Sequence, residues 1–249
     1  MRQADPEALE FFRAIHHGFD AIIAKHRGGE TMLPALNALA FTSYEGTVGL
    51  QTEDLPAPAC RKGCATCCTL RVVATAPEVF LVARYIRAMD DRFKTQKIDI
   101  RKRIARADEL TRGRNERERV RLRRRCPYIH AGACVIYPVR PLACRSHMSY
   151  SRQACLDAAA GRVDEVPYSP RHLQVRSLVQ NAMQSALRDA RYPWATYELN
   201  HALSIALDDD AAEATWLAGG DVLGAAQVVE VGAAEMADAF DQILGRQSA

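Results

Sequence analysis

Apolar residues near the start of the chain recur every three or four positions. Asp5 followed by Pro6 is a typical helix start, because the Asp side chain can cap a helix and Pro is tolerated in the first turn. The apolar positions that follow are Leu9, Phe12, Ile15, Phe19 and Ile22. This spacing predicts an amphipathic helix, and the Gly pair at 28–29 is its stop signal.

Helical spacing returns further along the chain. A shorter helix is expected from Met32 to Ala40, ahead of a loop that contains several Gly and Pro residues. Thr75 with Glu78 three residues later fits a capping box, and an apolar run follows. This pattern predicts a helix over about residues 76–89, preceded by a short strand or extended segment over 69–74.

The second half of the chain has a turn-rich part and a helical part. Three prolines between Cys126 and Ser146 exclude a continuous helix there. Beyond Pro170 the apolar positions are again spaced as in helices, on both sides of a break at Pro193. The whole pattern predicts a mainly α fold, a helical array with cysteine-rich, metal-organised loops.

We expect three segments packed as one domain. These are an N-terminal helical segment over residues 1–58, a cysteine-cluster metal-binding region over 59–160 and a C-terminal helical segment over 161–249. A chain of 249 residues, 48% of them hydrophobic, can bury its own core. The net charge of +3 is too small to predict a polyanionic partner.

The redox compartment follows from the lack of a targeting signal. The first twenty residues mix charged residues and histidines with apolar ones, so we expect no secretion signal, and no stretch is apolar enough to span a bilayer. A cytoplasmic location without membrane contact is therefore expected. Thiols stay reduced in the cytosol, so the eight cysteines indicate metal binding in place of disulfides or separately buried thiols.

The cysteines occur in two groups. The first has the pattern C-x3-C-x2-C-C, with a glycine inside it that allows a tight turn, and the second is spaced more widely. We expect the loops to fold together and place the thiolates around zinc or an iron–sulfur cluster. The candidate metal ligands are Cys60, Cys64, Cys67, Cys68, Cys126, Cys134, Cys144 and Cys155.

The number of metal centres stays open at this point. Eight thiolates suit two four-coordinate sites, or one cluster with four further thiols. Neighbouring side chains of an extended backbone point apart, so Cys67 and Cys68 are expected to serve different sites or to bridge two metals. Four basic residues would offset the thiolate charge. They are Arg61, Lys62, Arg140 and Arg145.

Both cysteine groups resemble a known family. CRKGCATCC at 60–68 and CPYIHAGACVIYPVRPLACR at 126–145 are similar to the two signatures of the bacterial cysteine-cluster proteins described as zinc- or iron-chelating, the YkgJ family with its CxxCxxCC-like motif. Cys155 matches a further cysteine of some members. The resemblance covers about 60–155 and implies metal chelation. A related cysteine cluster in flagellin lysine methylases, with which an iron–sulfur centre is associated, favours iron–sulfur slightly over zinc.

Two rival interpretations concern the whole protein. Cys60, Cys64 and Cys67 have the C-x3-C-x2-C spacing of radical S-adenosylmethionine enzymes, but the strand–helix alternation of their barrel is not evident. Residues 101–125 contain twelve Lys or Arg against four Asp or Glu, which could contact nucleic acid. Acidic residues are interleaved and aromatic ones are lacking, so a solvated helix over about 98–124, broken near Gly113, is favoured.

Other features give weaker predictions. His147 and His130 lie near the second cysteine group and could replace a thiolate, whereas His16, His17 and His26 are expected on the surface. No motif identifies catalytic residues, cofactor-binding residues or a partner. We therefore expect a cytosolic metal-binding protein. The alternatives are a cluster-dependent redox or methyl-transfer enzyme and a structural-zinc scaffold with a basic surface that contacts nucleic acid.

Overall fold

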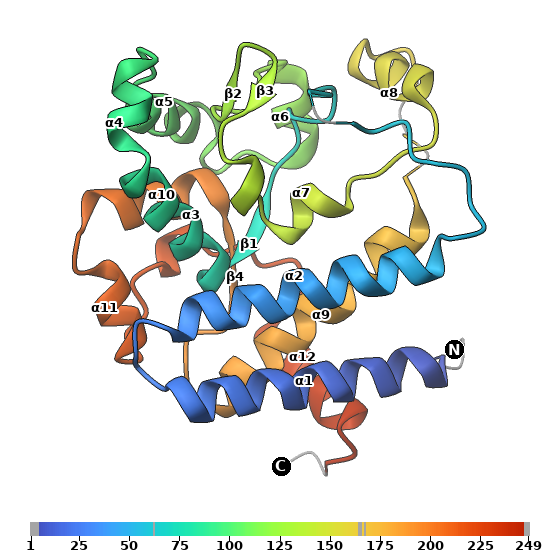
Figure 1. Ribbon diagram of the computed structural model, residues 1–249, viewed down its shortest axis with the longest axis vertical. Helices are drawn as coiled ribbons and strands as arrows, with labels where there is room; N and C mark the ends of the chain where they lie inside the picture. Colours follow the sequence, from blue (N-terminus) through green and yellow to red (C-terminus); the bar gives the residue numbers. More distant parts are fainter. Residues whose placement is uncertain (1–4, 62, 164–165, 167, 247–249) are drawn as a thin grey trace.

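The described part of the protein is mainly α-helical, as predicted. The computed structural model describes residues 5–61, 63–163, 166 and 168–246. Three long helices pack against one another: α1 (Pro6–His26), α2 (Met32–Gln51) and α9 (Pro170–Asp189). Figure 1 shows α1 and α2 running alongside each other, with α9 against both. Their shared apolar faces form one large part of the core.

The first helix has the predicted start and stop. The Asp5 side chain accepts a hydrogen bond from the backbone NH of Glu7 at 3.1 Å, and Gly28 adopts a left-handed φ of 68° just after the helix ends. The second helix starts at the predicted Met32 but continues to Gln51, beyond the predicted end at Ala40. Its glycines lie on the open side of the helix, while Tyr44 and Val48 extend the buried face. Packing therefore outweighs the low helix propensity of glycine here.

A second group of elements packs on α2 around a short two-stranded sheet. The capping box at Thr75 and Glu78 starts α3 (Ala76–Ala88), which packs on α2 and on α10 (Leu199–Asp208). Strands β1 (Val73–Thr75) and β4 (Thr196–Glu198) pair antiparallel, with Val73 opposite Glu198. Each strand leads directly into a helix, so this short sheet fixes the starts of α3 and α10 together.

The basic stretch folds as two helices, α5 (Ile100–Thr111) and α6 (Glu116–Leu122), and the chain breaks near Gly113 as predicted. It is not simply a solvated helix, because α5 packs on α10 and buries Ile104 and Asp108. Several arginines are also bound within the fold. Arg119 forms a buried ion pair with Glu198 at 3.0 Å. These internal contacts reduce the charge that the stretch offers to a polyanion.

The remaining elements complete the array. They are α4 (Asp90–Thr95), α11 (Ala212–Leu217), α12 (Ala233–Ile243) and the single 3-10 turns η1 (Tyr137–Val139) and η2 (Gly224–Ala226). Within the described ranges no helix combines the length and apolar character needed to cross a membrane.

The surface prediction for His16 is wrong. Its side chain is fully buried, and it follows Phe12 and precedes Phe19 and Ile23 on one helical face. Nε2 lies 3.0 Å from an Asp20 carboxylate oxygen, and burial lowers the pKa of the ring. The same spacing that identified the apolar face could have placed His16 on it. His17 is exposed and His26 is partly buried.

His172 in α9 gives a test of pH-dependent stability. The ring is buried with Nδ1 2.7 Å from the Ser169 hydroxyl, and burial lowers the pKa of the ring below 6.5. The unfolded chain therefore binds more protons below about pH 6.5, and the free energy of unfolding falls as the pH drops from there towards the folded pKa. The contribution of one group is at most about 1.4 kcal/mol per pH unit.

Urea unfolding of wild type and His172→Gln at pH 7.5, 6.0 and 5.0 measures this contribution. We expect the wild type to lose more stability than the variant on acidification, so that the difference between them narrows. Equal losses in the two proteins would contradict a titrating role for His172.

Candidate metal centre

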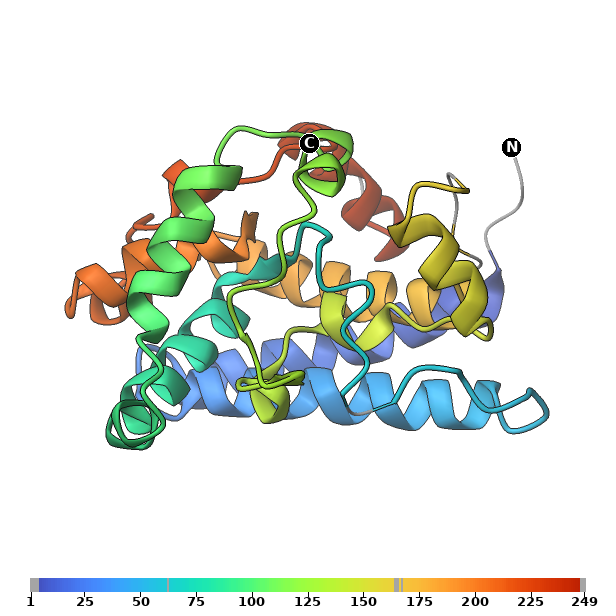
Figure 2. The same cartoon turned by 90° about the horizontal axis from the view of Figure 1, so that it is seen from above.

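The cysteines lie on two loops at one side of the molecule. The first loop, residues 60–68, connects α2 to β1. The second group comes from β2 (Ile129–His130), β3 (Ala133–Cys134), α7 (Leu142–Ser146), α8 (Arg152–Ala159) and the segments between them. Figure 2, together with Figure 1, shows the first loop passing between the β2–β3 hairpin and α8. Residues far apart in the sequence thus meet at one place.

Backbone hydrogen bonds build the first loop from successive turns. Cys64 NH donates to Arg61 O at 2.9 Å and Cys68 NH to Ala65 O at 3.2 Å. Gly63, inside the first of these turns, has φ of 89°, a conformation that favours glycine. The two loops are joined where Cys126 NH donates to Cys68 O at 2.7 Å. This bond holds the start of the second cysteine group against the end of the first.

All eight cysteines are free thiols and all are partly buried. The disulfide alternative is therefore not seen. Among the residues that the structure describes, no three sulfur atoms lie within 4.8 Å of one another; the one group of potential ligands that meets this criterion is His16, His17 and Asp20. The thiols are thus gathered on facing loops without forming a closed tetrahedral cage.

One set of neighbouring thiols surrounds Cys60. Burial raises the pKa of Cys60, and the nearby thiols of Cys67, Cys64 and Cys155 raise it further. Ser149 NH donates to Cys60 Sγ at 3.4 Å and opposes that shift. Cys155 comes from α8, so this set includes three residues of the first loop and one from the second group.

A second set lies around Cys126 and Cys144. Burial raises the pKa of Cys126, and the thiols of Cys144 and Cys134 add to the shift. Burial and the nearby thiols of Cys134 and Cys67 raise the pKa of Cys144 to about 12. Hydrogen bonding with the Cys68 thiol, together with burial, raises the pKa of Cys67. Cys67 and Cys68 therefore lie where the two sets meet.

The raised pKa values indicate how metal binding would change the protonation of these thiols. Thiols in such surroundings keep their protons, because neighbouring thiolates would repel one another and burial disfavours charge. A cation removes that obstacle, so metal binding would release protons from these cysteines. The donor set, all sulfur and held on two loops, fits zinc and fits an iron–sulfur cluster.

Of the three described bases that were expected to offset thiolate charge, Arg140 is the one placed near the thiols. Its guanidinium lies 4.1 Å from the centre of the Tyr137 ring, and it lowers the pKa of Cys67, Cys134 and Cys144. Its Nε is buried and has no hydrogen-bond partner among the described residues.

The other two described bases do not share this position. The contacts of Arg145 do not support the predicted charge-balancing role, because it forms an ion pair with Glu45 and donates to Arg140 O and Pro138 O. Arg61 is exposed. Lys62 lies outside the described residues. Arg145 therefore orders the loop that carries Arg140 without facing the thiols.

Histidine ligation is not favoured by the contacts. His147 Nδ1 lies 2.6 Å from Ala143 O, and the edge of its ring meets Tyr168. Burial lowers the pKa of His147. His130 is exposed on the β2–β3 hairpin. Tyr128 is buried beside the second set of thiols, and its hydroxyl donates to Asn200 Oδ1 at 3.2 Å.

Glu78 is a supporting residue whose link to this region the sequence did not reveal. Besides completing its capping box with Thr75, its buried carboxylate accepts a hydrogen bond from Leu142 NH at 2.7 Å. Leu142 begins α7, the helix that carries Cys144. Burial raises the pKa of Glu78, and the donors from Thr75 and Leu142 partly offset this. No local pattern at Glu78 announces a partner 64 residues away.

A cavity of about 850 Å³ borders the thiols. Its wall includes Cys67 and Cys155 together with Arg117, Arg121 and Tyr168. Small molecules in solution can therefore reach the side of the thiol cluster formed by the first set.

Comparison with known proteins agrees with the suspected family. Residues 59–160 match the family model CxxCxxCC, described as "Putative zinc- or iron-chelating domain". The matched segment contains all eight cysteines and coincides with the expected cysteine-cluster region. No curated protein and no solved structure matches the chain.

Proposed function

We propose that this protein holds two thiolate-ligated metal centres. The proposal is supported by the match of residues 59–160 to the CxxCxxCC family model of zinc- or iron-chelating domains. The first centre uses Cys60, Cys64, Cys67 and Cys155. The second uses Cys68, Cys126, Cys134 and Cys144. All eight cysteines are assigned a ligand role in this arrangement.

The observation that carries the proposal is the grouping of the thiols. The thiols that raise the pKa of Cys60 are Cys64, Cys67 and Cys155, whereas those that raise the pKa of Cys126 are Cys134 and Cys144. Cys67 also raises the pKa of Cys144, and its thiol is hydrogen-bonded to that of Cys68. We assign Cys68 to the second set because its backbone carbonyl accepts a hydrogen bond from Cys126 NH. Four sulfur ligands per centre match the needs of tetrahedral zinc and of a cluster.

Between the two metals we favour iron–sulfur. The ligand sets contain no histidine, and the thiols are clustered on loops, as in many cluster-binding proteins. Arg140 supports either metal, since four thiolates leave excess negative charge on a divalent ion or on a cluster. The cytoplasmic location that we propose would keep the thiols reduced and available for metal.

An enzyme that uses the centre is the second candidate, favoured by the cavity beside Cys67 and Cys155. The fold does not support a radical S-adenosylmethionine enzyme, because the described residues form two antiparallel two-stranded sheets and no parallel barrel. The nucleic-acid scaffold is weakened by the internal contacts of the basic helices, where Arg101 donates to Leu207 O.

Anaerobic purification followed by iron, zinc and sulfide analysis tests the proposal. We expect iron and acid-labile sulfide together with broad visible absorption. Colourless protein with stoichiometric zinc would reject the iron–sulfur assignment and keep chelation. Protein without bound metal after reconstitution with either iron and sulfide or zinc would reject the function itself.

A further inference from the structure

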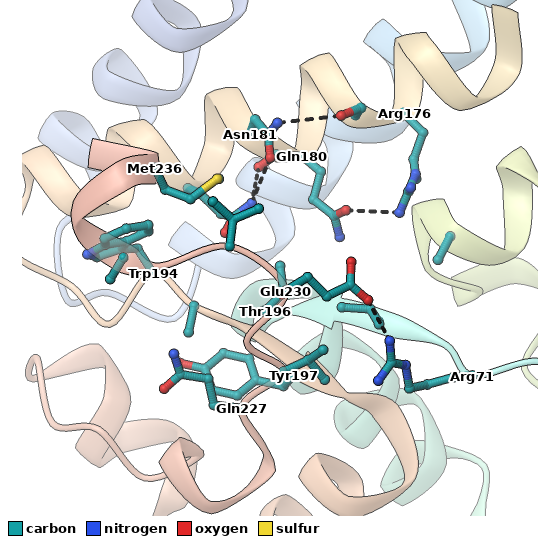
Figure 3. Close-up of a pocket in the computed structure, with 18 of the residues that line it drawn as sticks. Arg71, Arg176, Gln180, Asn181, Trp194, Thr196, Tyr197, Gln227, Glu230 and Met236 are labelled. Atoms are coloured by element: carbon teal, nitrogen blue, oxygen red, sulfur yellow. Dashed lines mark hydrogen bonds and ion pairs between the residues drawn. The ribbon is translucent and has the colours of Figure 1, made fainter. Parts of the chain in front are cut away.

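A pocket of about 700 Å³ lies beside α7, next to the cavity that borders the thiols, with which it shares Arg71, Glu116 and His147. Figure 3 shows its walls: Arg176 and Gln180 project from α9, Tyr197 and Gln227 lie across from them, and Trp194 and Met236 lie at one end. Three polar side chains of this wall present atoms with no hydrogen-bond partner among the described residues.

These atoms are buried donors. They belong to Arg176 (Nε), Gln180 (Nε2) and Tyr197 (Oη). Gln180 is 5% exposed and Tyr197 is fully buried. Arg176 Nη1 donates to Gln180 Oε1 at 3.3 Å, which turns the amide NH2 of Gln180 away from the arginine. Buried polar groups are nearly always paired, so three unpaired donors around one pocket, two on α9 and one across from them, indicate a bound group that supplies acceptors.

The charges of the pocket are distributed unevenly between its two arginines. Arg71 is already paired with Glu230 at 2.5 Å and with Glu116 at 3.9 Å. Arg176 forms no ion pair among the described residues, although its charge lowers the pKa of the buried Glu78. Asp221, the remaining acid of the wall, does not pair with it either. An anionic group that enters the pocket would therefore find a guanidinium without a carboxylate partner only at Arg176, whose Nη1 already donates to Gln180 Oε1.

The shape and lining of the pocket indicate the length and the apolar character of the rest of the ligand. Arg176 and Gln184 both line it and are eight residues apart on one face of α9, a separation of about 12 Å along the helix axis. Trp194 and Met236 lie beyond that end of the helix face and provide aromatic and thioether surface. The pocket thus has a donor-rich end and an apolar end.

We propose that this pocket binds a small carboxylate with an apolar tail, its acid group against Arg176 and Gln180 and its tail against Trp194 and Met236. A hydrogen bond from the unpartnered Arg176 Nε to a carboxylate is charge-assisted, and the unpartnered Gln180 amide nitrogen offers a second donor. The proposal goes beyond metal chelation, because none of these four residues belongs to the thiol sets. The residues Ala143 and His147 place α7 in the same wall.

Calorimetric titration of the full-length, metal-loaded protein with 6-phenylhexanoate tests the proposal. The probe combines one carboxylate with an apolar chain of about the right length. We expect a dissociation constant of about 0.1–1 mM, and at least about 10-fold weaker binding of the neutral analogue 6-phenylhexan-1-ol.

Two variants locate the binding. Arg176→Met removes the charge and is expected to weaken 6-phenylhexanoate binding at least about 10-fold. Gln180→Glu is nearly isosteric and replaces a donor by a carboxylate, so a comparable loss is expected even if Arg176→Met does not fold. Ser185→Ala is the matched control: its hydroxyl is also buried and unpartnered on α9 but does not line the pocket, and its affinity should equal that of wild type.

Three results would contradict the proposal. It fails if 6-phenylhexanoate does not bind at concentrations up to about 5 mM, if the alcohol binds as tightly as the acid, or if Gln180→Glu binds like wild type. Circular dichroism of each variant confirms that it is folded before its affinity is compared.

Discussion

Cys60→Ser and Cys126→Ser are each expected to lose one of two metal centres, and the double variant is expected to lose both. The two cysteines belong to different thiol sets, with Cys60 near Cys64, Cys67 and Cys155, and Cys126 near Cys134 and Cys144. Serine keeps the size of the side chain but is a poor ligand for zinc or iron in place of a thiolate. Metal per chain should therefore fall in two equal steps.

Stability should fall with metal content. A structural metal site contributes folding free energy directly, because the site does not exist in the unfolded chain. A loss of about 3–5 kcal/mol per centre corresponds to a drop of about 10 °C in Tm for a chain of this size. Elemental analysis and thermal unfolding of the same samples measure both quantities.

Ser146→Ala is the control for these variants. Ser146 is buried in α7 near Cys144 but offers no thiol, and its hydroxyl donates to Ala143 O at 3.2 Å. It should keep its full metal content. Complete loss of metal in either single variant would argue for one shared centre, and unchanged content would remove that cysteine from the ligand set.

Glu78→Ala is expected to lower both the free energy of unfolding and the affinity for metal. The substitution leaves Leu142 NH and two Thr75 donors without their acceptor and opens a cavity between α3 and α7. We expect a loss of about 3 kcal/mol, reduced from a larger value because removing a buried acid also removes its desolvation cost. Glu78→Gln keeps one acceptor and should lose about half as much.

Glu118→Ala provides the comparison. Glu118 completes the same capping-box geometry with Asn115 at the start of α6, but it is exposed, and its side-chain hydrogen bond among the described residues is to Asn115 NH. We expect Glu118→Ala to lower the free energy of unfolding by about 1 kcal/mol and to leave the metal affinity unchanged. Urea unfolding and competition with a chelator measure the two effects. If Glu78→Ala and Glu118→Ala behaved alike, the link from Glu78 to α7 would have no energetic importance.

Elements specified by local sequence were the ones that could be predicted. The start of α1 at Asp5, the capping box of α3 and the breaks at Gly113 and Pro193 all depend on residues close in the chain. The end of α2 was wrong because two glycines were given more weight than the buried face that continues through Tyr44 and Val48.

The candidate site was predictable in composition and not in geometry. Cysteine spacing predicted the candidate ligands, and the family match over residues 59–160 supports the region that contains them. That Cys155 neighbours Cys60, or that Arg140 and not Arg145 faces the thiols, depends on how distant loops pack. The carboxylate pocket had one readable signal, the polar positions Arg176, Gln180 and Gln184 on one face of α9.

The short helix α7 is common to the two regions of the molecule. Cys144 lies among the thiols, whereas its neighbour Ala143 lines the pocket of Figure 3. A one-turn helix moves as a unit, so a displacement imposed by the metal centre would also change the shape of the pocket wall. Thermodynamic reciprocity then requires an equal effect in the other direction: whatever factor metal loading changes in carboxylate affinity, the bound carboxylate changes in metal affinity.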